Sequence, residues 1–364
     1  MPDLTSDTGA GRVDLDDADA LRAADATGAL LHASMAGAQI RAVATAADAG
    51  ALDELTGFRP RALVWVSGRS TRARHAAAMV AALAEVVGGS AVPPLVHAHS
   101  LPAWVGSLDV VLVSGDDAGD PDLASAIDTA AHRGAFVVAD VPREGPVGES
   151  GGGRATWLEP LPYLPPHRGV VRHLAAGMAV LTALGAGGLD VGAAADAVDA
   201  ELEGLGPDLA TPVNPAKLLA TSVAGSDPVV WIHSDPVSAA YCDRAVAAFC
   251  DVGRVTASST VWDSVRSQAE RDQGRPPVDP LASLFHDDEL DGARQDAPVR
   301  HLGMVLGADD HLVRMAAGPL AEVEWITDRG RDTADDASAP LSGKVAALMA
   351  RTELSAAYLL VGGL

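Results

Sequence analysis

The chain has 364 residues, 48% of them hydrophobic, so it is long enough for two lobes with large cores and too apolar for a disordered chain. It carries 49 acidic residues against 26 lysines and arginines, a formal net charge of −23. This charge argues against nucleic acid and anionic membranes as main partners, and we expect neither.

The sequence also lacks the signals of export and membrane insertion. The first 20 residues are acidic and contain no apolar signal-peptide core. The most apolar helical segment, Leu174–Leu189, is shorter than a bilayer span and is typical of a buried helix. Cys242 and Cys250 give no disulfide framework. We therefore expect a cytoplasmic protein.

The first half of the chain alternates short apolar runs with Ala-rich stretches. An acidic tail and a helix over Leu21–Ala47 occupy residues 1–54, and a first sheet unit is predicted over 55–165. The Gly-rich segment Gly145–Gly153 is predicted to be a loop. Strands are expected at Arg61–Val66, Pro94–His97, Asp109–Ser114 and Ala135–Asp140.

A helical connector is predicted over residues 166–224, and the strand–helix pattern then restarts in residues 225–364. Ser234–Pro236 has the residues of a helix start, and Arg266–Ala297 is predicted to be mostly loop. Strands are expected at Pro228–His233, Gly253–Ser258, Arg300–Gly307 and Ala321–Thr327. The predicted fold class is α/β, with two doubly wound parallel-sheet units and a ligand crevice at the carboxyl ends of the strands.

The polar turn Ser67–Thr71 (SGRST) lies between a predicted strand and helix. Backbone N–H groups and the positive end of the helix dipole make such a turn an anion cradle, and Arg69 and Arg72 can add charge-assisted bonds. An ordinary helix cap with solvated arginines explains the residues equally well. The turn lacks the spacing of dinucleotide and P-loop motifs.

The turn after the third strand carries Asp116 and Asp117, which would oppose a phosphate placed beside them. The interpretation that we favour is a solvated acidic loop, or a cap for the helix that begins near Pro121. Two aspartates are a weak metal signal. No metal site is expected from the histidines either, since their spacing provides no convincing ligand set: His97, His99, His233, His301 and His311.

Several stretches together resemble the sugar isomerase (SIS) family of the bifunctional phosphoglucose/phosphomannose isomerase type. They are LPAWVG at Leu101–Gly106 with the strand and turn that follow, NPAKLLA at Asn214–Ala220, and the closing segment Lys344–Leu364 with Tyr358. The resemblance implies two SIS-type units, a homodimer, no cofactor and a sugar phosphate as ligand. It places substrate binding at Gly68, Arg69, Ser70, Thr71 and Ser114.

The resemblance also assigns catalytic candidates. Arg168 matches the family's arginine after the first subdomain, and FHDDELDG holds His286 and Glu289 near the expected histidine and acid, although the two cannot be aligned in one register. The family's proton-transfer glutamate should fall in Ala245–Asp251, which contains none. Two functions stay open: an aldose–ketose isomerase acting on phosphosugars, or a non-catalytic sugar-phosphate sensor or partner subunit.

Overall fold

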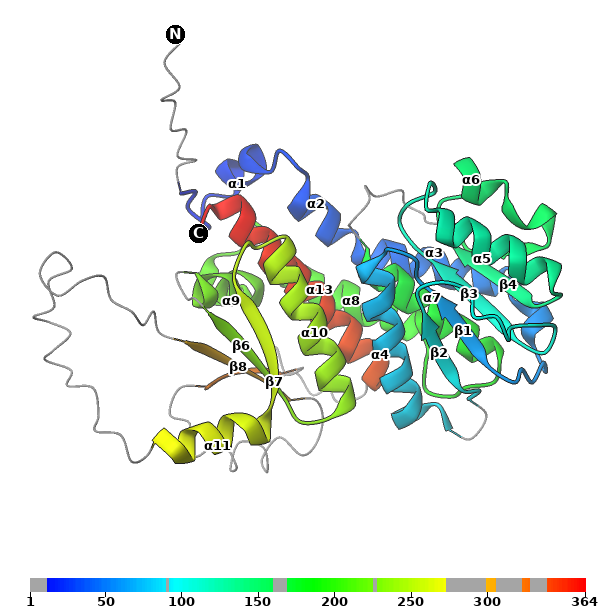
Figure 1. The fold of residues 1–364 in the computed structure, drawn as a ribbon. Helices are drawn as coiled ribbons and strands as arrows, with labels where there is room; N and C mark the ends of the chain where they lie inside the picture. Colours follow the sequence, from blue (N-terminus) through cyan, green and yellow to red (C-terminus); the bar gives the residue numbers. More distant parts are fainter. Residues whose placement is uncertain are drawn as a thin grey trace, which may run out of the picture.

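Two parallel sheets flank a layer of helices in the computed structural model (Figure 1). The structure describes residues 12–89, 92–159, 169–224, 228–272, 299–305, 323–327 and 339–364. In these residues the predicted α/β class with two parallel-sheet units is confirmed. The domain boundaries after residues 54, 165 and 224 stay a prediction.

The first sheet has the strand order β2-β1-β3-β4-β5, and every pair in it is parallel. Its strands are β1 Leu63–Val66, β2 Leu95–Ala98, β3 Val110–Ser114, β4 Phe136–Asp140 and β5 Ala155–Trp157. Because β1 and β3 are neighbours, the turns that follow them meet at one edge of the sheet.

Alternate residues of these strands face opposite layers. Leu63, Trp65 and Leu112 pack with α4 (Thr71–Val87) and α7 (Val170–Ala183), whereas Val64, Val66 and Val111 pack with α5 (Pro121–His132). The sheet is therefore covered on both faces, as its almost continuous apolar strands require.

The stretch Gly145–Gly153, predicted to be a loop, is instead ordered into two short helices, α6 (Gly145–Gly148) and η3 (Ser150–Gly153). They pack against α5 and are followed by β5, which the sequence pattern did not reveal. Four glycines there take positive φ, so the glycines form compact turns rather than an irregular loop.

The prediction of one continuous helix over Leu21–Ala47 is also wrong. It is divided into α1 (Ala18–Ala24), α2 (Ala29–Ser34) and α3 (Ala36–Asp48). Gly28 has a φ of +64°, and Asp25 accepts hydrogen bonds from the first amides of α2, so the chain turns between α1 and α2.

The second sheet has the order β7-β6-β8-β9 and is likewise parallel. Its strands are β6 Val229–His233, β7 Ala257–Val261, β8 Arg300–Val305 and β9 Val323–Thr327. As the sequence predicts, α10 (Pro236–Asp251) starts after Ser234–Asp235, and the structure adds that Asp235 caps it in a capping box with Ser238. Of the stretch Arg266–Ala297, predicted to be mostly loop, residues 266–272 instead belong to α11 (Trp262–Asp272), and residues 273–297 lie outside the described residues.

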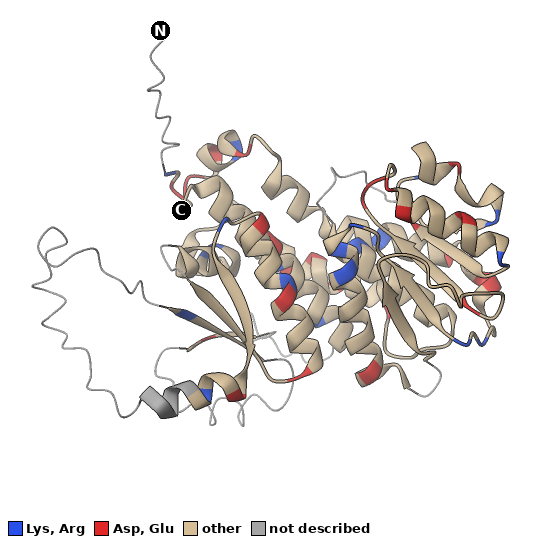
Figure 2. Ribbon diagram, viewed as in Figure 1, with Lys and Arg blue, Asp and Glu red and all other residues tan. Residues whose placement is uncertain are grey.

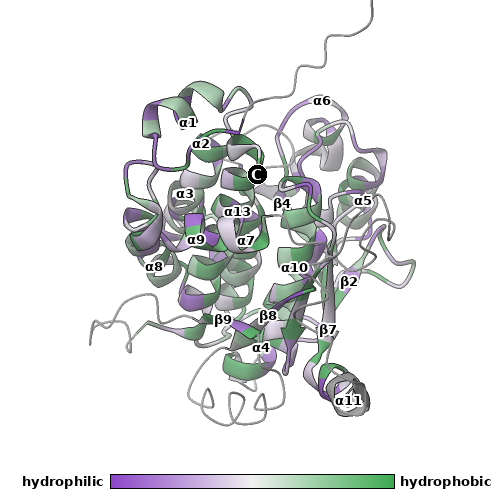
Figure 3. Cartoon of the chain, turned by 90° about the vertical axis from the view of Figure 1, so that its left-hand side faces the viewer, coloured by the Kyte–Doolittle hydropathy of each residue, from purple (hydrophilic) through white to green (hydrophobic). Residues whose placement is uncertain are grey.

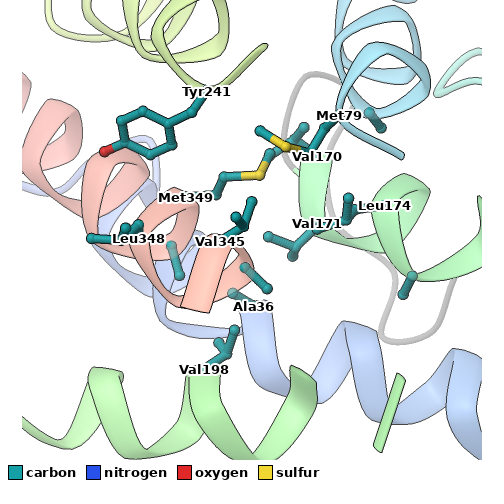
Figure 4. Close-up of a cluster of buried hydrophobic side chains, with 14 of the residues drawn as sticks. Ala36, Met79, Val170, Val171, Leu174, Val198, Tyr241, Val345, Leu348 and Met349 are labelled. Carbon is teal, nitrogen blue, oxygen red and sulfur yellow. The ribbon is translucent and has the colours of Figure 1, made fainter. Parts of the chain in front are cut away.

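The helical layer is completed by η1 Asp53–Leu55, α8 Val191–Glu203, η4 Thr211–Val213, α9 Pro215–Val223 and α13 Leu341–Gly362. Figure 3 shows α13 and α7 in the middle of the molecule, with α3, α8, α9 and α10 around them. Figure 4 shows part of this core: Met79 of α4 and Val171 of α7 point toward Met349 and Val345 of α13.

Only α13, among the described residues, is long and apolar enough to cross a membrane. However, 89% of its most apolar window is buried inside the protein, as in the core helix of a soluble protein.

Candidate functional site

The turn between β1 and α4 forms the first part of the site. Gly68 has a φ of +50°, and Ser70 caps α4 by accepting a hydrogen bond from the amide of Ala73. The amides of Thr71 and Arg72 follow the cap, and no acceptor contacts them among the described residues. The Arg69 and Thr71 side chains are exposed. The turn therefore presents unpaired donors at the positive end of a 17-residue helix.

The turn after β3 is bonded to this first turn. The Asp120 carboxylate accepts hydrogen bonds from the Arg69 amide at 3.0 Å and from the Asp122 amide at 2.9 Å, so it caps α5 and links the two turns. A Cβ atom on Gly68 would lie 2.5 Å from Asp120 Oδ2. Glycine is therefore required at position 68 both for its φ and for this close approach.

A buried network of two carboxylates and two cations lies beneath the turns. Asp140, at the end of β4, accepts from Arg172 Nη1 at 2.8 Å and from His173 Nδ1 at 2.6 Å. His173 Nε2 lies 3.2 Å from Asp116 Oδ1, whose other oxygen accepts from Ser70 Oγ at 2.8 Å. The side chains of Asp140 and His173 are fully buried, and that of Asp116 is 14% exposed.

The charges in this network fix each other's protonation. Burial alone would raise the pKa of Asp116, but His173 and Arg172, with the Ser70 hydroxyl, outweigh it and hold that pKa well below its usual range. Burial alone would lower the pKa of His173, but Asp140 and Asp116 raise it. The network thus holds two negative and two positive charges and is neutral.

This arrangement corrects the interpretation of the acidic turn. Asp117 is exposed and accepts from the Gly119 amide, as a solvated loop residue should, and the cap of α5 is Asp120. Asp116, in contrast, is mostly buried and paired with His173 and Arg172. Its charge is compensated within the protein, so it opposes a nearby anion less than an isolated aspartate would.

The network should make the folding stability fall both at high pH, through His173, and at low pH, through Asp116. The pKa of His173 is about 6.5 in the unfolded chain and higher in the fold. The stability that this difference contributes is fully present below about pH 6.5 and is lost as the pH rises toward the folded-state pKa. The lowered pKa of Asp116 contributes stability above about 3.9 that is lost at lower pH. Thermal unfolding of the protein should therefore show Tm falling above about pH 6.5, and this fall should be smaller in His173→Gln. An equal fall in both proteins would show that His173 is not protonated in the fold.

Two predicted serines lie at the same strand ends. Ser114 closes β3, is fully buried and has no hydrogen-bond partner for its hydroxyl among the described residues. Ser67 directly follows β1, and its hydroxyl lies 2.9 Å from Nε2 of the exposed His97. Partial burial, with the charge of Arg74, lowers the pKa of His97, so the neutral ring can accept a hydrogen bond from the Ser67 hydroxyl.

The predicted site residues fall into two groups. Gly68, Arg69, Ser70 and Thr71 lie together in the β1–α4 turn, and Ser114 lies at the end of the adjacent strand. The three catalytic candidates lie outside the described residues: Arg168, His286 and Glu289.

The proton-transfer glutamate was expected in Ala245–Asp251 of α10, and this stretch of the helix faces the core. Ala245, Ala248 and Phe249 of α10 are buried. A carboxylate from elsewhere reaches this helix: Glu353 of α13 accepts from Nε of Arg244 at 2.7 Å. No cluster of three metal-ligating side chains occurs in the described part of the chain.

Sequence reasoning missed Asp140, Arg172 and His173. Asp140 ends a buried strand in AFVVAD, a polar residue at the carboxyl end of a parallel strand, where ligand crevices lie. Arg172 and His173 interrupt the apolar run VVRHLAAGMAVL, and two adjacent basic residues inside a buried helix require partners. Both signals were present in the sequence, but the pairing depends on tertiary contact.

No protein-family model and no curated protein sequence matches the chain. Among solved structures, it is similar to a candidate phosphosugar isomerase from Silicibacter pomeroyi DSS-3, with TM-score 0.55 and 14% identity over 90% of this chain and 95% of that one. It is also similar to a candidate phosphosugar isomerase from Clostridium difficile 630, with TM-score 0.55 and 12% identity over 92% of each chain.

A third similar structure is the C-terminal domain of glucosamine-fructose-6-phosphate aminotransferase from Francisella tularensis. Its TM-score is 0.54 at 9% identity, over 92% of this chain and 96% of that domain. These similarities confirm the SIS-type fold. The bifunctional isomerase type, the homodimer and the cytoplasmic location stay predictions.

Proposed function

We propose that the protein binds a sugar phosphate, or a related anionic carbohydrate derivative, with the phosphate at the β1–α4 turn. The observation that carries this proposal is the set of donors at that turn: the amides of Thr71 and Arg72, the Thr71 hydroxyl and the exposed Arg69 side chain. Together these groups suit an anion at a helix N-terminus.

Two further features support an anion there. The neighbouring Asp116 is neutralised by Arg172 and His173, so the network adds no net negative charge to the turn. The fold is that of two candidate phosphosugar isomerases and of a domain whose parent enzyme is named for fructose 6-phosphate. Ser114, buried at the end of β3 with an unpaired hydroxyl, is a further candidate donor if a ligand enters the crevice.

Calorimetric titration with fructose 6-phosphate tests the proposal. We expect saturable binding, weakened about threefold to tenfold in Thr71→Val, which loses one neutral hydrogen bond, and about tenfold or more in Arg69→Ala, which loses a charged one. Arg59→Ala is the matched control, because Arg59 is also exposed but precedes the opposite end of β1. Equal affinity in all four proteins would place the ligand elsewhere, and no binding to the unmodified protein would reject the proposal.

Turnover should be slow if the protein acts as an isomerase. The stretch Ala245–Asp251 provides no glutamate, and positioned acid–base groups contribute about 10²–10⁴-fold to such reactions. A coupled assay should follow mannose 6-phosphate, glucose 6-phosphate and fructose 6-phosphate with the purified protein. Rapid interconversion would show that another carboxylate transfers the proton.

A further inference from the structure

Two buried arginines lie on the helices through which the two sheet units adjoin. Arg72 lies in the first turn of α4, beside the proposed phosphate turn, and Arg244 lies on α10 of the second unit, which packs against α4. Arg72 is only 4% exposed and Arg244 2%. Figure 2 shows basic positions gathered in the middle of the molecule, around the starts of α4 and α7.

The hydrogen bonds at this junction are incomplete. Arg244 donates through Nε and Nη2 to Glu353 of α13, but its Nη1 is buried and unpaired. Arg72 Nε is buried and unpaired as well, and within the described ranges Arg72 forms neither a hydrogen bond nor an ion pair. Buried guanidinium groups without partners are costly, so the junction has a missing acceptor.

The missing acceptor must be negatively charged. Arg72, Arg244 and Glu353 sum to one positive charge. His75 adds none at neutral pH, because burial, with the charges of Arg244 and Arg74, lowers its pKa to about 4. Asp243 and Asp251 also act on this cluster, but their side chains are exposed to water and remain hydrated. The junction therefore carries one buried positive charge that no neighbouring carboxylate in the described ranges balances.

The position of Arg72 connects this surplus charge with the phosphate turn. Both Asp116, which is bonded to Ser70 of that turn, and Glu353 of α13 act on the pKa of Arg72, which burial and then Arg244 lower. The Arg72 side chain therefore lies near the turn and near the second unit at once. The junction therefore lies next to the phosphate turn, at the start of the helix that packs against the second unit.

We propose that Arg72 and Arg244 bind a carboxylate at the end of the ligand opposite its phosphate, so that the substrate class is an acidic sugar phosphate such as a phosphorylated aldonic acid. This rests on the proposed phosphate site. A carboxylate carries the single negative charge that balances the junction, and its two oxygens match the planar donor pairs of guanidinium groups.

Calorimetry with three ligands tests the proposal. They are 6-phosphogluconate, sorbitol 6-phosphate, which replaces the carboxylate by an alcohol, and gluconate, which lacks the phosphate. We expect 6-phosphogluconate to bind about 10- to 100-fold more tightly than sorbitol 6-phosphate, the effect of a charge-assisted hydrogen bond. Gluconate should bind most weakly.

Arg72→Met should abolish this preference, so that both phosphates bind with the affinity of sorbitol 6-phosphate. Its Tm should not fall, because Arg72 has no partner to lose among the described residues. Arg74→Met, an exposed arginine one residue beyond Ala73 on the same helix, is the matched control and should keep the preference. Arg244→Lys, which keeps the positive charge but loses the unpaired Nη1, should reduce it in part.

The outcomes separate the two proposals. Equal binding of both phosphates by the unmodified protein, or a preference that survives in Arg72→Met, would overturn the carboxylate site and leave the phosphate site intact. Failure of both phosphates to bind would reject the phosphate site itself, and the carboxylate site with it.

Discussion

Replacing Asp140 with Asn should lower the free energy of unfolding by about 3–5 kcal/mol, the usual cost of removing one partner from a buried ion pair. Asp140 is fully buried and accepts from both Arg172 and His173. Asparagine keeps the shape but not the charge, so the two cations would be left with Asp116 alone. Chemical denaturation of the two proteins measures this difference.

Asp128→Asn is the matched control for that experiment. Asp128 pairs with His132 on α5, but both side chains are more than half exposed, so its loss should change stability by less than about 1 kcal/mol. Similar losses in Asp140→Asn and Asp128→Asn would show that the buried network does not hold the β4–α7 contact together.

Asp116→Asn should tighten the binding of fructose 6-phosphate by about tenfold or more. The Asp116 carboxylate is bonded to Ser70 of the phosphate turn, and its loss would leave Arg172 and His173 facing Asp140 alone. The site would then carry one net positive charge, and removing one charge–charge repulsion across a few ångströms is worth more than 1.4 kcal/mol at an effective dielectric of about 20.

The same change should destabilise the free protein, because Asp116 also pairs with buried His173. Calorimetry and thermal unfolding of Asp116→Asn, with Asp117→Asn as the exposed control, separate the two effects. Unchanged or weaker phosphate binding in Asp116→Asn would mean that the phosphate does not lie beside the turn.

The sequence predicted the sheet units because their signal is local. Runs such as LVWV and VVLVS are short, β-branched and apolar, and only a strand buried on both faces suits them. The polar turn Ser67–Thr71 was equally readable, since a cap, a glycine and a helix start follow one another along the chain.

The charged network could not be predicted in the same way. Asp116, Asp140 and His173 come from three elements, and only the packing of α7 beneath the β3 and β4 ends brings them within hydrogen-bond distance. Two adjacent aspartates of one turn therefore have different environments. Asp117 is exposed to water, whereas Asp116 pairs with Arg172 and His173, which lie 56 and 57 positions later in the chain. The sequence alone does not distinguish an exposed aspartate from one that is buried and paired with distant cations.

A crystal structure of the protein with bound fructose 6-phosphate would show where the phosphate lies. We expect phosphate oxygens at hydrogen-bond distance, about 3 Å, from the amides of Thr71 and Arg72 at the start of α4. A phosphate bound away from the β1–α4 turn, or a turn that stays empty at saturating ligand, would contradict this expectation.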